Sequence, residues 1–367
     1  PPFTELNQRT VESDTNYFPI PHLGVNYRLD NDSVVGLSSY FVGVNTDYPP
    51  VDPLGLNSNV GTFGGGAVGA DVVHGEVAAT YARRWGSLAV GASAVLAYQR
   101  MDIRGTELFG SNVFGIALPG NTDPSVLMAD GNDDNFSDRG FDHAFGLGAK
   151  LGVLWQVTPT FNLGLAYHSE VFTQDQDKYA DVIPGDDDAV NNPPQVTVGL
   201  AWKPISSVAV VADVHQVFYT DTTFYNNGFQ NFIDYCLLPT IPGTPNFGNQ
   251  TKSYCFGGTQ GPGLGWEDVT IYRFGVQWQQ RADMTWRVGY SHGNNPIGGE
   301  DILFAVLLPT ITEDTYSVGI TKGFNNNRYE LDITAFYSPE NTLTGPLGFV
   351  QLNVEQFEIG LNWTIHF

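Results

Sequence analysis

The sequence contains no run of about 18 apolar residues, the minimum for a transmembrane helix. This lack excludes a helical membrane protein, although hydrophobic residues make up 42% of the 367 positions. Basic residues are also scarce, with 16 Lys and Arg against 39 Asp and Glu and a net charge of −23. No nucleic-acid partner is expected, because nucleic-acid binding needs basic stripes.

Catalytic and metal-binding motifs are missing as well. No G-x-S-x-G or H-E-x-x-H occurs, and the seven histidines are scattered, so we expect neither an enzyme nor a cofactor. One loop has the alternating oxygen ligands of a calcium site, but Asn135 replaces the EF-hand glycine and Phe141 replaces its bidentate Glu. A solvated acidic loop is the expectation and a weak surface calcium site the alternative, with the candidate ligands Asp130, Asn132, Asp134 and Asp138.

The only two cysteines, Cys236 and Cys255, lie in the longest irregular segment. In an oxidising compartment, two cysteines this close in sequence predict a disulfide, which stabilises a loop of this size by about 3 kcal/mol on the chain-entropy model. Two free thiols are the alternative.

What the chain does contain is a repeated two-residue period. At the C-terminus, Phe357, Ile359, Leu361, Trp363, Ile365 and Phe367 alternate with small or polar residues. Alternation places the apolar side chains on one face of a strand. The 42 glycines, 17 tyrosines and 24 phenylalanines suit a β-protein with tight turns and aromatic girdles.

The same period recurs along the chain and predicts thirteen strands. Short turns between them alternate with long irregular segments, as in a meander barrel with short inner turns and long outer loops. In a compact soluble domain, six such long connections would count against the assignment. The predicted strands are 21–29, 33–42, 72–84, 87–100, 143–156, 161–170, 195–202, 207–219, 269–279, 284–292, 314–323, 328–337 and 355–367.

We therefore predict an all-β protein: a transmembrane, antiparallel, up-and-down β-barrel of about 14 strands. Residues 1–367 form a single barrel domain, in which 1–20 are an irregular segment and 21–367 the barrel. Thirteen is an odd count, whereas single-chain bacterial barrels usually have an even number of strands. One strand is therefore expected to be missing at the N-terminus.

Charged residues in these strands fall on the face opposite to the large apolar side chains. Both signs occur there, so a self-compensating network inside the barrel is the expected role. A charged path through the lumen is the alternative. The predicted lumen-lining residues are Asp213, His215, Arg273, Arg287, Glu330, Asp332 and Glu358.

Several strand motifs occur in a familiar order over nearly the whole chain. They are Pro21-His-Leu-Gly-Val-Asn-Tyr-Arg-Leu29, Val34–Tyr48, Phe145–Trp155, Pro194–Pro204, Trp286–Ser291 and Asp314–Ile320. In order and spacing the chain resembles the outer-membrane long-chain fatty acid transporter (FadL) family. The resemblance implies a 14-stranded barrel in the outer membrane of a Gram-negative bacterium, surrounded by lipid bilayer and lipopolysaccharide. The family's Asn-Pro-Ala hatch signature does not occur, so we expect the N-terminal hatch and first strand to be absent from this sequence.

The resemblance further implies passive uptake of hydrophobic small molecules, either long-chain fatty acids or hydrocarbons. A structural or interaction barrel and a general water-filled porin are the alternatives, and protein partners cannot be predicted. Small residues in one strand suggest a lateral gap, namely Gly36, Ser38, Ser39 and Gly43. Apolar residues of one outer loop suggest a landing groove, with loop-on-loop packing as the alternative: Phe109, Phe114, Ile116, Leu118, Leu127 and Met128.

Overall fold

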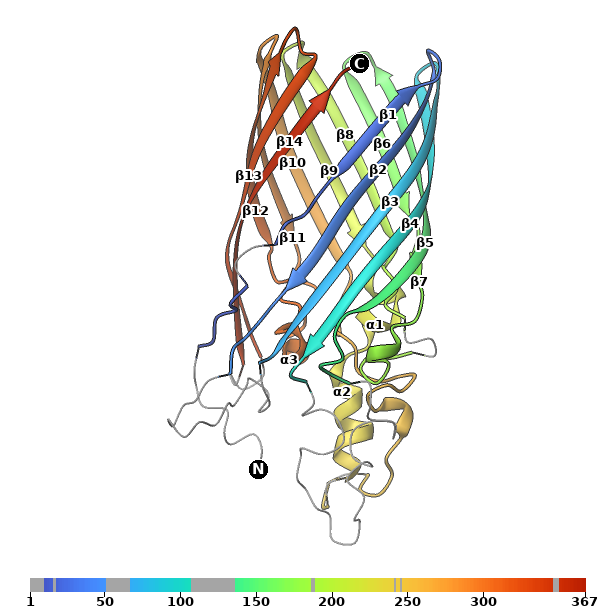
Figure 1. Ribbon diagram of the computed structural model, residues 1–367, viewed down its shortest axis with the longest axis vertical. Coiled ribbons are helices and arrows are strands. Elements are labelled where there is room, and N and C mark those ends of the chain that lie inside the picture. The colour runs from blue at the N-terminus through green and yellow to red at the C-terminus, as the bar shows by residue number, and fades with distance from the viewer. Residues whose placement is uncertain are drawn as a thin grey trace.

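The computed structural model describes residues 10–15, 18–50, 67–106, 136–185, 189–240, 242–244, 246–345 and 350–367. Its regular structure is almost entirely antiparallel β-sheet (Figure 1). The strands are β1 (Leu23–Arg28), β2 (Ser33–Asn45), β3 (Gly69–Trp85), β4 (Leu88–Arg104), β5 (Asp142–Thr158), β6 (Phe161–His168), β7 (Phe172–Thr173), β8 (Gln195–Ile205), β9 (Val208–Val217), β10 (Val269–Arg281), β11 (Met284–Gly293), β12 (Asp314–Phe324), β13 (Tyr329–Thr344) and β14 (Gln351–Ile365).

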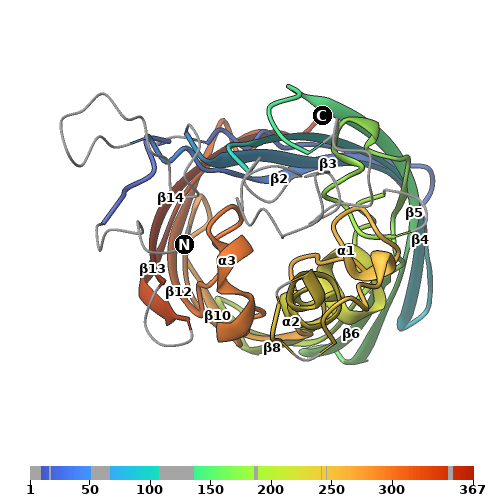
Figure 2. The same ribbon diagram turned by 90° about the horizontal axis from the view of Figure 1, so that it is seen from below.

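The sheet has the topology of a simple meander. One continuous hydrogen-bonded path runs from β1 to β14, with each strand antiparallel to the next. It passes directly from β6 to β8, because the two-residue β7 lies outside the path and pairs with β5. Seen along the barrel axis, the strands surround an interior (Figure 2). The prediction of an all-β, up-and-down barrel is confirmed, and the thirteen strands of the path match the thirteen predicted ones.

Large apolar side chains cover the outside of the sheet. In β14, Phe357, Ile359 and Leu361 are 64%, 65% and 72% exposed, values expected when lipid rather than protein covers a surface. Among the described residues, no helix is long and apolar enough to cross a membrane. Six tryptophans lie near the short connections and form one belt: Trp85, Trp155, Trp202, Trp278, Trp286 and Trp363.

The long connections lie at the opposite end, at the bottom of Figure 1, which we call the outer end. The described parts contain the helices α1 (Thr223–Asn226), α2 (Phe229–Phe232) and α3 (Ile302–Ala305) and the short helical turns η4 (Asp177–Tyr179), η5 (Tyr219–Asp221), η6 (Ile233–Leu237), η7 (Leu238–Thr240), η8 (Lys252–Tyr254) and η9 (Gly299–Asp301). In Figure 2 the three α-helices lie within the ring of strands, across its mouth.

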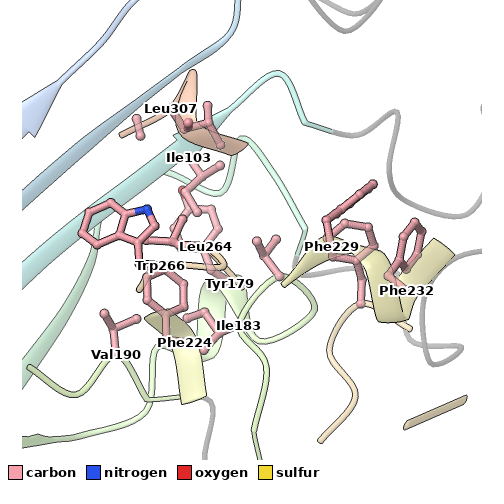
Figure 3. Close-up of a cluster of buried hydrophobic side chains, with 14 of the residues drawn as sticks. Ile103, Tyr179, Ile183, Val190, Phe224, Phe229, Phe232, Leu264, Trp266 and Leu307 are labelled. Atoms are coloured by element: carbon pink, nitrogen blue, oxygen red, sulfur yellow. The ribbon is translucent and has the colours of Figure 1, made fainter. Parts of the chain in front are cut away.

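Buried side chains from these connections form the hydrophobic core of the molecule. Most come from the chain between β7 and β8, between β9 and β10, and between β11 and β12, and Val68 and Phe136 of two further connections join them; we call this assembly the outer plug (Figure 3). Phe232 and Phe256 pack with ring centroids 4.8 Å apart, and the disulfide between Cys236 and Cys255 closes the loop that carries them. The predicted disulfide is thus confirmed.

Strand ends are where the structure departs most from the sequence pattern. β3 begins at Gly69 and β4 ends at Arg104, each beyond the predicted limits, because their inward residues Ala70 and Ile103 pack against the outer plug. β13 likewise continues to Thr344 beside an earlier start of β14. These extensions depend on packing partners far away in sequence.

Candidate functional site

An apolar cavity lies between the inner face of the wall and the outer plug. The wall contributes Ala70 and Val72 from β3 and Met101 and Ile103 from β4. These residues are paired across the two strands, Ala70 with Ile103 and Val72 with Met101, so that all four side chains point inward. The plug contributes Phe224, Tyr225, Phe256, Leu264, Leu307 and Leu308.

The cavity is small and uncharged. Its volume is about 50 Å³, and none of the residues that line it is charged. A cavity of roughly 150 Å³ is needed to hold one benzene ring, so a ligand of that size requires side-chain movement. Met101 can supply it, because methionine has three rotatable bonds and adapts to irregular spaces.

Next to the cavity, on the side away from the outer end, the following inward residues form a buried polar belt. The Glu76 side chain is fully buried, and its carboxylate lies 2.7 Å from Lys150 Nζ, 3.2 Å from His74 Nε2 and 3.4 Å from His168 Nε2. The Tyr40 ring lies beside them, with its centroid 4.7 Å from Lys150 Nζ. Five side chains from β2, β3, β5 and β6 thus meet at one point inside the barrel, where only a paired carboxylate can be accommodated.

A glutamine connects this belt to the outer plug. The Gln99 side-chain Nε2 donates to Val190 O at 2.8 Å, to Asn192 Oδ1 at 3.3 Å and to His74 Nδ1 at 3.3 Å. The amide has two hydrogens for these three contacts, which join the loop between β7 and β8 to the belt at His74.

Farther from the outer end, the lumen is lined by small side chains. A hollow of about 470 Å³ is bordered on the inner face by Gly91, Gly152, Gly164, Ala166 and Gly199. Gly91 pairs with Gly152 and Gly164 with Gly199, so neighbouring strands leave space at the same level. The cavity, the polar belt and the hollow therefore follow one another along the inner wall, in order of increasing distance from the outer end.

The predicted lumen-lining residues lie on the inner face of the other half of the barrel and form pairs. Arg273 Nε lies 3.1 Å from Asp213 Oδ1, and Arg287 lies 3.6 Å from Asp332. His215 Nδ1 contacts Thr197 Oγ1 at 2.8 Å, His366 lies 3.5 Å from Glu330, and Gln356 donates to Glu358 at 2.6 Å. A role of these residues in lining a path stays a prediction.

The predicted lateral gap falls on β2, whose pairing differs between its two halves. The ladder with β3 is continuous from Ser33 to Asn45 without a register shift, so Gly36 and Gly43 mark no bulge there. On the other edge, the ladder with β1 reaches only from Val34 to Ser39. Phe18 packs on Gly43, and Thr15 contacts Asn45, so the N-terminal segment follows the outer half of β2. A lateral gap stays a prediction.

Other predicted site residues lie outside the described residues. These are the groove residues Phe109, Phe114, Ile116, Leu118, Leu127 and Met128 and three of the four calcium candidates, Asp130, Asn132 and Asp134. The fourth, Asp138, accepts hydrogen bonds from Gly105 N at 3.0 Å and Ser137 Oγ at 2.7 Å. Within the described ranges no group of His, Cys, Asp and Glu could hold a metal ion.

Neither the cavity nor the polar belt was predicted from the sequence. Glu76 and His74 could have been found, because they share the inward face of a predicted strand with Ala78 and Thr80. The cavity gave no such signal, because Phe224, Tyr225 and Leu264 belong to loops without periodicity.

Comparison with known proteins finds the same architecture in solved structures. No protein-family model matches the sequence, and no curated protein matches it significantly. Among solved structures, the Pseudomonas putida toluene transporter TodX is 15% identical with a TM-score of 0.64, covering 97% of this chain and 84% of that one. The Ralstonia pickettii toluene transporter TbuX is 15% identical with a TM-score of 0.54, covering 88% and 76%.

A FadL homologue of Pseudomonas aeruginosa is 12% identical with a TM-score of 0.55, covering 94% of this chain and 76% of that one. At such identities a match shows the fold and not the substrate. The resemblance inferred from the strand motifs is confirmed at this level: the structural neighbours are FadL-family outer-membrane transporters, and this chain has their fold.

Proposed function

We propose that the chain is an outer-membrane channel for passive entry of small, neutral, hydrophobic molecules. The observation that carries this proposal is the apolar cavity between the wall and the outer plug, which no charged residue lines. The toluene transporters that share the fold support the same substrate class.

Hydrocarbons fit the cavity better than long-chain fatty acids. A carboxylate moved from water into an apolar site needs a cation or several donors to compensate for lost hydration. The lysine of the polar belt, Lys150, is already paired with Glu76. The volume of about 50 Å³ also favours a compact molecule over a long acyl chain.

A general porin is the less favoured alternative. The outer plug fills part of the mouth with a packed hydrophobic core, whereas a porin needs a continuous aqueous path. No specific observation favours a purely structural barrel.

Uptake of labelled toluene and of labelled oleate should be compared in cells with and without the protein. Toluene uptake should rise with the protein, and oleate uptake should not. Met101→Trp, which fills the cavity, should abolish the gain. Leu96→Trp is the matched control, because this residue of the same strand is 51% exposed on the lipid face. Equal toluene uptake with and without the protein would refute the proposal.

A further inference from the structure

One hydrogen-bond donor, Tyr225, lines the otherwise apolar cavity, and a second, Trp266, packs against it. The Trp266 side chain is 5% exposed, and its Nε1 has no hydrogen-bond partner among the described residues. The partly buried Tyr225 lines the cavity, and its hydroxyl, which is not fully buried, makes no hydrogen bond within the described part of the chain. A buried donor without a partner, such as Trp266 Nε1, is rare in folded proteins, because it has lost its hydrogen bonds to water.

The two donors belong to one rigid aromatic group. The rings of Tyr225 and Trp266 lie 5.2 Å apart, and Tyr219 packs on both at 5.2 and 4.9 Å. The backbone also connects them, because Trp266 N donates to Tyr225 O at 2.7 Å. In Figure 3 the indole nitrogen lies on the ring edge nearest to Ile103 and Leu307, two residues of the cavity lining.

The tyrosine is held in its donor form. Burial, with a smaller contribution from neighbouring Tyr219, raises the pKa of the Tyr225 hydroxyl above its ordinary value. Water would satisfy these donors poorly, because a water molecule needs polar partners for its own protons and the surrounding side chains are apolar. A carbonyl or ether oxygen, which only accepts, matches this arrangement.

We propose that the cavity takes a neutral, mainly apolar molecule that carries one acceptor oxygen, such as an aryl ketone, with Tyr225 and Trp266 binding the oxygen. This assignment rests on the proposed function and narrows its substrate class. It makes Tyr225 a specificity-determining residue that distinguishes oxygenated compounds from bare hydrocarbons of similar shape. Anionic compounds stay excluded, because no cation lines the cavity.

Binding of acetophenone and of ethylbenzene to the purified, detergent-solubilised protein tests the assignment by titration calorimetry. The two probes have similar shapes and differ in the carbonyl oxygen. Tyr225→Phe should weaken acetophenone binding about fivefold, the factor that corresponds to one neutral hydrogen bond, and should leave ethylbenzene binding unchanged. Trp266→Phe should have the same selective effect.

Tyr235→Phe is the matched control, because Tyr235 packs against Tyr254, with ring centroids 4.8 Å apart, in the same connection and outside the cavity lining. It should change binding of neither probe. Equal changes for both probes in Tyr225→Phe, or no change for either, would overturn the inference while ethylbenzene binding by the unaltered protein still supports the proposed function. If the unaltered protein binds neither probe, both proposals fail. Tyr225→Phe removes one atom, so it decides the question even if Trp266→Phe does not fold.

Discussion

Lys150 on β5 reaches across β4 and places its Nζ 2.7 Å from the carboxylate of Glu76 on β3. The carboxylate is fully buried, whereas the lysine side chain keeps 30% of its surface exposed. The two residues therefore contribute unequally to stability. Removing the lysine leaves a buried charge without its cation, but removing both residues leaves no charge behind.

Lys150→Met should accordingly destabilise the barrel by about 3 kcal/mol, the lower end of the cost of breaking a buried ion pair. The double variant Glu76→Gln with Lys150→Met should recover most of this loss. Urea unfolding in lipid vesicles measures both effects. Lys203→Met, at an exposed lysine near a short turn, is the control. Additive effects of the two substitutions would contradict a direct pair.

The outer plug should loosen at alkaline pH. Burial raises the pKa of Tyr219 from 10.0 to about 12. The folded state therefore holds this proton over a range in which the unfolded state has lost it, so the stabilising effect is complete below pH 10 and is lost as pH rises toward 12. Near-ultraviolet circular dichroism follows the aromatic cluster, and Tyr219→Phe should move the loss to higher pH. An unchanged midpoint in this variant would assign the transition to another group.

Breaking the disulfide should affect the plug and not the barrel. The bond joins Cys236 and Cys255 within one connection, so Cys236→Ser with Cys255→Ser removes a constraint on 19 residues of sequence separation. The expected cost is about 3 kcal/mol, confined to this loop. Limited proteolysis should cut the variant faster between β9 and β10, while its heat-modifiable gel migration stays unchanged. Loss of that migration would mean that the loop is needed for barrel assembly.

A lateral exit predicts that the outer half of β2 must be free to separate from the N-terminal segment. Joining Phe18→Cys to Gly43→Cys should then stop toluene uptake in the folded protein, because Phe18 packs directly on Gly43. Joining Gly24→Cys to Ser38→Cys is the control, since these residues are already paired in the β1–β2 ladder. Unchanged uptake through the first cross-linked variant would exclude an exit at this place.

The barrel could be predicted from sequence because its signal is local. Each strand shows a two-residue alternation, as Phe357 to Phe367 do, and lipid rather than a distant partner determines which side chains are apolar. The plug could not be predicted in this way. Tyr179, Phe232 and Trp266 are buried only because separate connections meet, and their sequence positions show no period. The polar belt is intermediate, since alternation places Glu76 inward but only the fold brings Lys150 to it.

The tryptophan belt allows the depth of the cavity in the membrane to be estimated. Trp85 and Val72 lie at opposite parts of β3, thirteen residues apart. With a strand rise of about 3.3 Å and a tilt of about 40°, this separation corresponds to roughly 30 Å along the membrane normal. Tryptophan prefers the interface between lipid and water, and the apolar band of such barrels is about 25 Å tall. The cavity is therefore level with the headgroups of the outer leaflet, so a molecule held there has entered the protein but still has the whole hydrocarbon layer to cross.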